Sequence, residues 1–98
     1  MPNSSRLRQI VKTAQFELAL RNIIENAREA DDFIEAVEWS LARNPRIGQQ
    51  MTTDDPAVWF LPMIEEQRLK KPLFLLYTFD SERVVFLHIH YALVGEPN

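Results

Sequence analysis

Cysteine is absent from the sequence, which excludes disulfides, thiolate metal ligands and a cysteine nucleophile. Glycine is scarce, with only Gly48 and Gly95, so the chain has no glycine-rich loop to cradle a phosphate. Neither the Gly-x-Ser-x-Gly turn of hydrolases nor the His-Glu-x-x-His metal motif occurs. No apolar run approaches the roughly 18–20 residues of a membrane span, and none resembles a signal peptide. We therefore expect a cytoplasmic protein with no membrane partner and no cofactor.

The composition is that of a globular domain. Of the 98 residues, 46% are hydrophobic and 26% are charged, so we expect residues 1–98 to form one domain with its own core. The formal net charge is -3. A protein that depends on phosphate contacts is usually basic, so this charge argues against nucleic acid as the main partner. It does not exclude a local basic patch.

Apolar residues in the first part of the chain recur at helical spacing. Residues 7–13 (LRQIVKT) alternate weakly, and we expect either a short first strand or an extended lead-in segment there. From residue 14 the period changes to that of a helix. One apolar stripe is then formed by Phe16, Leu20, Ile23, Ile24 and Ala27.

A second helix is predicted to begin at Asp32. Asp32 and Glu35 have the spacing of a capping box, and carboxylates are favourable near a helix N-terminus. The helix is expected to end near Arg43, because the residue before proline in Asn44-Pro45 avoids the helical conformation. We expect the two helices to form an antiparallel hairpin. One long bent helix is the alternative, because the two apolar stripes almost keep phase.

The second half of the chain predicts strands joined by polar segments. Residues 58–64 form a strand that contains Pro62, which favours an edge position or a bulge. Residues 73–79 are apolar on both faces, as in a central strand, and residues 84–91 are the hairpin partner. Polar connections are expected at 45–56, 65–71 and 80–82. The predicted fold class is α+β, a short N-terminal strand and a helical hairpin packed on a small antiparallel sheet.

His88 and His90 are separated by one residue on the last strand, so both should point to one face. Two imidazoles at this spacing can share a metal ion, but a site needs further ligands and the chain has no cysteine to supply them. We therefore assign no metal site. The alternatives are two polar residues on the less buried face of the strand, or general acid–base chemistry.

Tyr77, His90 and Tyr91 are the candidate catalytic residues. Their strands are predicted to pair, so the three side chains could lie close together. A base beside cations would suit cleavage of a phosphodiester, because the base activates a 2′-hydroxyl and the cations hold the developing charge. The structural alternative is that both tyrosines are ordinary strand residues with the ring inside and the hydroxyl at the rim.

Candidate binding residues are basic or aromatic. Arg68, Lys70 and Lys71 form the densest basic cluster, which predicts either a phosphate-binding patch or a solvated turn. Trp59 on the edge strand and Arg46 in the preceding loop offer a partner surface, where a disordered segment could add a strand; such a segment could instead lay a helix along the helical hairpin. Trp39 lies off the stripe of its helix, and exposure of its ring would indicate a partner surface.

Three segments together resemble the toxins of the RelE/ParE superfamily. Residues 10–20 (IVKTAQFELAL) resemble the opening strand and helix of that family. Residues 38–48 (EWSLARNPRIG) are similar to its second helix and the Pro-x-x-Gly loop that follows. Residues 72–91 (PLFLLYTFDSERVVFLHIHY) are similar to its closing hairpin, in which Tyr-x-x-Asp leads into a valine-rich strand. The match covers most of the chain in order and spacing.

This resemblance implies the toxin of a type II toxin–antitoxin pair, held silent by an antitoxin protein. RelE-like members cut messenger RNA on the ribosome, whereas ParE-like members inhibit DNA gyrase. His90-Tyr91 resembles the terminal His-Tyr of the YoeB-like nucleases. However, the places where those nucleases carry cations correspond here to Leu61, Pro62, Phe74 and Thr78.

The resemblance therefore favours a ParE-like toxin that acts by binding DNA gyrase. A ribosome-associated, metal-independent endoribonuclease that acts on messenger RNA is the alternative. An inert interaction module with the same fold is a third interpretation. A homodimer is a further assembly that the sequence leaves open.

Overall fold

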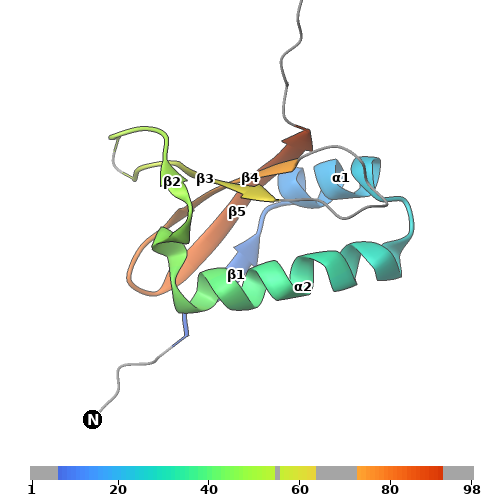
Figure 1. The fold of residues 1–98 in the computed structure, drawn as a ribbon, viewed down its shortest axis with the longest axis horizontal. Coiled ribbons are helices and arrows are strands. Elements are labelled where there is room, and N and C mark those ends of the chain that lie inside the picture. Colours follow the sequence, from blue (N-terminus) through green and yellow to red (C-terminus); the bar gives the residue numbers. More distant parts are fainter. Residues whose placement is uncertain (1–6, 55, 64–72, 92–98) are drawn as a thin grey trace, which may run out of the picture.

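The computed structural model describes residues 7–54, 56–63 and 73–91, and their arrangement is shown in Figure 1. In chain order the helices and strands are β1 (Gln9–Lys12), α1 (Ala14–Ile23), α2 (Ala27–Arg43), β2 (Gln49–Gln50), β3 (Trp59–Met63), β4 (Leu73–Phe79) and β5 (Arg83–Tyr91). The strands form one sheet in the order β1-β5-β4-β3-β2. The α+β class is confirmed, and β4 is the central strand as predicted. The sheet is mixed because β1 pairs with β5 in parallel, whereas the other pairs are antiparallel.

The two helices form an antiparallel hairpin, as expected, but the predicted break between them is wrong (Figure 1). The helical structure is interrupted at residues 24–26, and Asp32 lies inside α2. The N-terminus of α2 is capped instead by Asn26, whose side-chain oxygen accepts a hydrogen bond from the Glu29 N–H at 3.0 Å. Ile24 adopts an extended conformation and is still buried, so the apolar pattern continues across the break.

The start of α1 and the end of α2 lie where the sequence predicts them. Thr13 caps α1 by accepting a hydrogen bond from the Phe16 N–H at 3.1 Å, and its hydroxyl donates to the Phe86 carbonyl at 2.9 Å. The cap therefore also joins α1 to β5. At the other end of the hairpin α2 stops at Arg43, as predicted, and the Asn44 side chain accepts a hydrogen bond from the Arg46 N–H.

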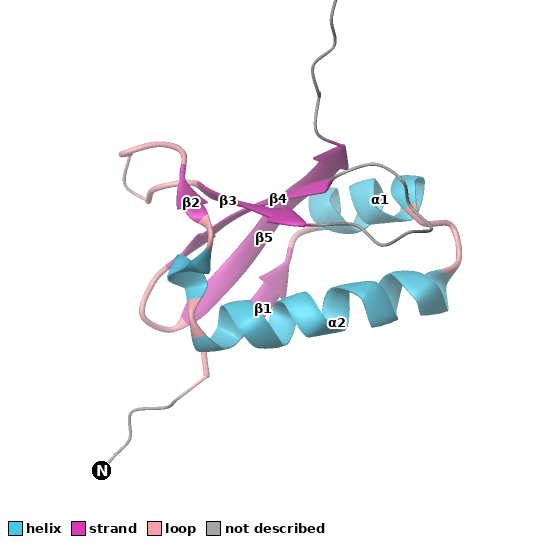
Figure 2. Cartoon of the chain, in the orientation of Figure 1, coloured by secondary structure: helices cyan, strands magenta, loops and turns pink. Residues whose placement is uncertain are grey.

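The core lies between the helices and one face of the sheet (Figure 2). Alternate residues of β4 point into it, so Leu73, Leu75 and Tyr77 are fully buried while their neighbours are partly exposed. Burial of one large apolar side chain contributes about 1.5–3 kcal/mol, so each of these residues contributes to the stability of the fold. The buried residues that the helices and β5 contribute are Phe16, Leu20, Ile24, Ala30, Ile34, Leu41, Val84, Phe86 and Ile89.

The sheet pairing contains one irregularity that decides which side chains face the core. Tyr77 pairs with Phe86, but its neighbour Leu76 pairs with His88, so Leu87 is an extra residue in β5. Side chains alternate along a strand, and one extra residue reverses the alternation. For this reason Phe86 and Ile89 both face the core, and the histidines on either side of Ile89 face away from it.

The strand with proline is next to the edge strand β2, so the expected edge position holds only for the part of β3 that β2 does not cover. β3 pairs with β4 along its whole length, but β2 pairs only with Trp59 and Phe60. Pro62 thus lies beyond the end of β2, where the missing N–H removes no pairing found in the described part of the chain. β2 itself was not predicted, because two exposed glutamines in a polar segment carry no strand pattern. The charged turn expected at 65–71 lies outside the described residues.

Candidate functional site

The Tyr77 side chain is part of the core, and its hydroxyl is hydrogen-bonded to the backbone. Its side chain is fully buried, and its hydroxyl donates a hydrogen bond to the Pro45 carbonyl at 2.5 Å and accepts one from the Gly48 N–H at 3.2 Å. Burial raises the pKa of Tyr77 to about 12, although the Gly48 hydrogen bond opposes this shift. The hydroxyl is therefore protonated at neutral pH and already engaged with the backbone, which makes it unsuited to act as a base.

His90 lies on the open face of the sheet, opposite the face that the helices cover. Its ring is 5.6 Å from that of His88 in a stacked arrangement and 5.9 Å from that of Phe74 in an edge-on arrangement. Phe74 in turn stacks on Phe60 at 5.2 Å. The Nδ1 atom of His88 is buried and has no hydrogen-bond partner among the described residues. These ring contacts join His90 to an aromatic cluster on the open face.

The structure does not bring the three candidate catalytic residues together. Tyr77 and His90 belong to opposite faces of the sheet, because His90 pairs with Phe74 and Tyr77 with Phe86. Tyr91 pairs with Leu73 at the end of β5, and its side chain lies outside the described part of the structure. In the ranges 7–54, 56–63 and 73–91, no three histidine or carboxylate side chains gather as metal ligands would. Among the same residues no helix is long and apolar enough to cross a bilayer.

Arg46 lies at a corner of the sheet where two arginines cover one aromatic ring. A single 3-10 turn (η1, Pro45–Ile47) places its guanidinium 5.5 Å from the centre of the Phe79 ring. The guanidinium of Arg8 lies 5.9 Å from the same ring, and its Nε donates to the Asp80 carbonyl at 2.8 Å. A cation over an aromatic face is worth about 0.5–1 kcal/mol at an exposed site, so both contacts help to fix this corner.

The remaining predicted binding residues divide into two groups. Trp59 is half-buried, packs against the core and meets the Phe79 ring edge-on at 5.3 Å. Its indole therefore contacts the Phe79 ring from the side of the core. Arg68, Lys70 and Lys71 lie outside the described residues, and their role as a phosphate patch stays a prediction. Trp39 on α2 is 52% exposed. From the sequence, such exposure indicates a partner surface.

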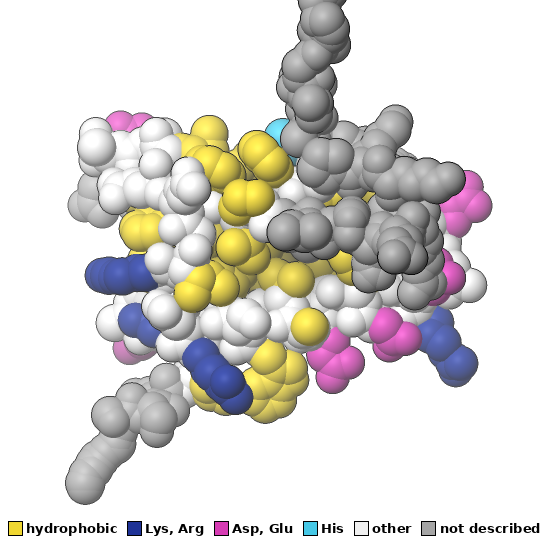
Figure 3. Space-filling model, viewed as in Figure 1, with side chains coloured by type: hydrophobic (Ala, Val, Ile, Leu, Met, Phe, Trp, Pro, Cys, Tyr) yellow, Lys and Arg dark blue, Asp and Glu magenta, His cyan; other side chains and the backbone are white. Residues whose placement is uncertain are grey.

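Charge is distributed unevenly over the surface. In Figure 3 basic side chains gather over η1, the C-terminal end of α2 and the β4–β5 hairpin, with some acidic side chains among them, whereas a basic side chain at the opposite end of α2 lies among acidic ones. Arg8 and Arg83 contribute to the basic end, and sequence reasoning did not identify either of them. Gln9 pairs with Arg83, so the parallel pairing of β1 with β5 brings the segment that carries Arg8 to this end of the sheet. No local sequence pattern predicts the pairing of β1 with β5, since the two strands are far apart in sequence.

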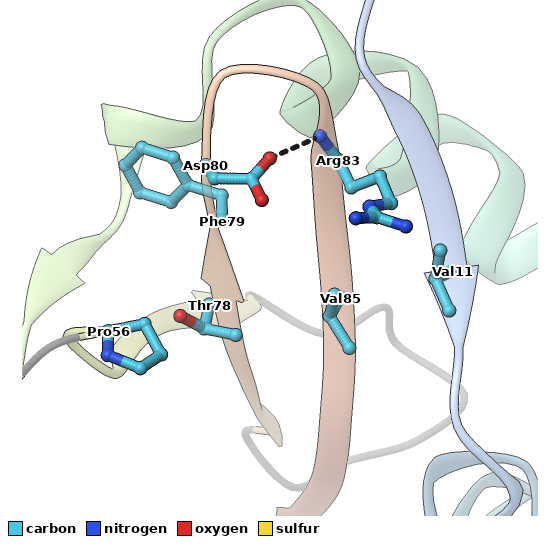
Figure 4. A pocket seen from close by; sticks show the side chains of 7 residues that line it. All are labelled: Val11, Pro56, Thr78, Phe79, Asp80, Arg83 and Val85. Atoms are coloured by element: carbon cyan, nitrogen blue, oxygen red, sulfur yellow. Dashed lines mark hydrogen bonds between the residues drawn. The ribbon is translucent and has the colours of Figure 1, made fainter.

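Beside this basic end the open face of the sheet has a shallow cavity of about 280 Å³. Figure 4 shows its floor, in which Thr78, Val85 and Val11 lie in a row across β4, β5 and β1. Asp80 and Arg83 lie at the upper rim, where the Asp80 carboxylate accepts hydrogen bonds from the Glu82 and Arg83 N–H groups at 2.8 Å each. These two bonds lower the pKa of Asp80.

Comparison with known proteins identifies the fold. No family model and no curated protein matches the sequence. Among solved structures, a chain of the toxin–antitoxin complex RelBE2 from Mycobacterium tuberculosis is similar, with a TM-score of 0.64 over 93% of this chain and 98% of that chain. The two sequences are 18% identical. At this identity the likeness shows the fold alone, and it confirms the RelE/ParE-like architecture that the sequence segments resembled.

Proposed function

We propose that this chain is the toxin-like component of a type II toxin–antitoxin system, acts in the cytoplasm and is neutralised by an antitoxin protein. The observation that carries the proposal is the likeness to a chain of a toxin–antitoxin complex over nearly the whole length of both chains. Fold alone does not determine function, so the mode of action has to be argued from the side chains.

The residues at the positions where the similar nucleases carry cations support action by binding rather than by cleavage. RNA cleavage requires groups that stabilise charge on the transition-state phosphate, normally arginine or lysine. His90 makes ring contacts with Phe74 and His88, and the positions at which the similar nucleases carry cations hold Leu61, Pro62, Phe74 and Thr78 in this chain. Tyr77 is on the other face of the sheet with its hydroxyl engaged. We therefore propose a ParE-like mode of action in which the protein binds DNA gyrase.

The corner of the sheet at which Arg46 and Arg8 cover the Phe79 ring is the surface that we propose for target binding. Arg46 is exposed there, and its guanidinium lies over the Phe79 ring. Trp59 contacts the same ring. Arg68, Lys70 and Lys71 remain proposed contributors on the strength of their charge alone. Arginine and aromatic residues are both enriched at protein interfaces.

Growth of bacteria after induced expression of the chain alone tests the proposal. We expect growth arrest, and we expect the same arrest from a His90→Ala/Tyr91→Phe variant. Purified chain should inhibit DNA supercoiling by gyrase and leave messenger RNA on translating ribosomes intact. Circular dichroism of the variant would verify that it is folded.

Each other outcome selects one of the alternatives. Loss of arrest in the folded variant, together with RNA cleavage by the unmodified chain, would favour the ribosome-associated endoribonuclease. No arrest by either version, with no gyrase inhibition, would favour an inert interaction module. Arrest by both versions without gyrase inhibition would keep a toxin that acts by binding and would reject gyrase as its target.

A further inference from the structure

One exposed row of α2 carries a tryptophan between opposite charges. Glu35, Trp39 and Arg43 follow one another at intervals of four residues, and residues at this spacing are neighbours on one face of a helix. All three are exposed. Figure 3 shows this side of α2 along the lower edge of the molecule, where hydrophobic surface lies between a basic side chain and acidic ones. The Trp39 row, as we call these three residues, therefore has an acidic end, an indole and a basic end.

The charges of the Trp39 row are not paired within the part of the chain that the structure describes. Among the described residues, neither Glu35 nor Arg43 forms an ion pair or a side-chain hydrogen bond. The ion pair that α2 does form there joins Glu38, on the flank of the helix, to Lys12 at 2.8 Å. Asp32 extends the acidic end by one further turn. A partner on this row therefore meets charges that are available for pairing.

The Trp39 row is complementary to itself when a second copy lies against it in the opposite direction. With a two-fold axis at the tryptophan, the two indoles meet on the axis. Glu35 of each copy then lies opposite Arg43 of the other, because both residues are about 6 Å from Trp39 along the helix axis. In a parallel arrangement each charge would meet its like, which is repulsive. The order of the charges thus favours the antiparallel pair.

We propose that two copies of the chain associate through this face of α2, with one indole against the other and two reciprocal Glu35–Arg43 ion pairs. Leu7 adds apolar surface at 45% exposure. The N–H of the residue after it donates to the Ala42 carbonyl at 3.0 Å, which holds Leu7 near the C-terminal end of α2. One pair of helices buries less than the roughly 1,200–2,000 Å² of a standard interface, so we expect a weak dimer that dissociates on dilution.

A peptide of a single charge fits the Trp39 row less well than a second copy does. A basic peptide would pair with Glu35 and Asp32 but would meet Arg43 as a like charge. An acidic peptide would meet the reverse conflict. A fitting partner therefore carries both signs in the opposite order around an apolar group, and the chain itself has this arrangement. The inference goes beyond the proposed toxin function and does not depend on it.

Sedimentation of the purified full chain, from micromolar to millimolar concentration, tests the association. We expect the average mass to rise from that of a monomer towards that of a dimer. Trp39→Ala should weaken the association about thirtyfold, because a tryptophan at the centre of an interface contributes more than its neighbours. Circular dichroism verifies that the variant is folded.

Charge reversal tests the antiparallel pairing itself. Glu35→Arg and Arg43→Glu should each weaken self-association about tenfold, since either change turns both ion pairs into like-charge pairs. When the two variants are mixed, every arginine of one faces a glutamate of the other, and association should return. Arg21→Glu and Glu25→Arg make the same changes of charge at exposed positions outside the row. They should leave the association unchanged, both alone and mixed.

Recovery on mixing separates a lost contact from a lost fold, because two misfolded variants would not restore each other. Three results would overturn the inference. They are a monomer at every concentration, association that persists undiminished in Trp39→Ala, and no recovery when the two charge variants are mixed. A monomer would leave the Trp39 row to a different partner such as the antitoxin. Because sedimentation needs only the folded chain, any of these results leaves the growth experiment and the proposed toxin function unaffected.

Discussion

The Tyr77 hydroxyl lies 2.5 Å from the Pro45 carbonyl oxygen, to which it donates a hydrogen bond, and so joins the centre of the sheet to the turn after α2. The same hydroxyl accepts a hydrogen bond from Gly48, so both ends of the turn are held. Arg46 lies between these two residues. The position of its guanidinium over Phe79 thus depends on a buried tyrosine whose role is structural.

Replacing Tyr77 by phenylalanine should lower the free energy of unfolding by about 1–3 kcal/mol. The ring still fills the core, but the buried Pro45 carbonyl loses its donor and no side chain replaces it. Urea denaturation of both proteins measures the difference. Thr78→Val is the matched control, because it removes a partly exposed hydroxyl bonded to a carbonyl that water can reach. A loss no larger than that of the control would contradict this account.

Alkaline pH should destabilise the protein through the same residue. The pKa of Tyr77 is about 12 in the folded chain and about 10 when unfolded. The folded-state pKa is the higher one, so the stabilisation is complete below pH 10 and is lost as the pH rises towards 12. The full loss is about 3 kcal/mol, at 1.36 kcal/mol for each pKa unit.

Urea denaturation across this pH range, with Tyr77→Phe as the reference, isolates the tyrosine. Lys12 also titrates at high pH, because its hydrogen bond to Glu38 raises its pKa, but it does so in both proteins. The stability difference between the two proteins should therefore shrink as the pH increases. A difference that stays constant would show that Tyr77 ionises as it does in the unfolded chain.

Gly48→Ala should destabilise the fold by about 1–3 kcal/mol through steric overlap. A Cβ atom at this position would lie 2.5 Å from both the Phe60 carbonyl oxygen and the Tyr77 hydroxyl. Tyr77→Phe removes one of these two atoms but leaves the backbone oxygen in place. A double-mutant cycle should thus show that Gly48→Ala costs less in the Tyr77→Phe background, by about 0.5 kcal/mol or more. Strict additivity of the two losses would rule out the proposed contact.

Local sequence patterns predicted the elements of the fold better than its long-range pairing. Asn44-Pro45 marked the end of α2, and the apolar residues on both faces of β4 identified the central strand. The helix break was misplaced because Ile24 stays buried across it, and the spacing of apolar residues therefore shows no gap. The parallel pairing of β1 with β5 joins opposite ends of the chain, and neither strand carries a sign of its partner.

The expected closeness of Tyr77 and His90 was wrong because of the parity of one strand. Without the extra residue Leu87, His90 would pair with Leu73 on the face that carries Tyr77. The bulge moves His90 to the opposite face instead. A signal was present, since Val84 and Phe86 are apolar at even positions whereas His88 and His90 are polar at even positions. A strand that buries its even positions at one end and exposes them at the other requires a bulge.

The two tryptophans should respond differently to truncation. Trp59→Ala should lower the free energy of unfolding by about 3 kcal/mol, because its half-buried ring packs on the core and on Phe79. Trp39→Ala should change it by no more than about 0.5 kcal/mol, since the ring is 52% exposed. Urea denaturation gives both values. Acrylamide should quench the fluorescence of Trp39 more strongly than that of Trp59 in single-tryptophan variants.

The same pair of variants can test the partner surface that exposure of Trp39 indicates. If Trp39→Ala is folded and stable but no longer co-purifies with a co-expressed antitoxin, the loss cannot be attributed to unfolding. Trp59→Ala provides the contrasting case, because weaker binding there should follow the loss of stability. Equal quenching of the two rings, or a large loss of stability in Trp39→Ala, would show that Trp39 packs against the protein and leave α2 without this evidence of a partner.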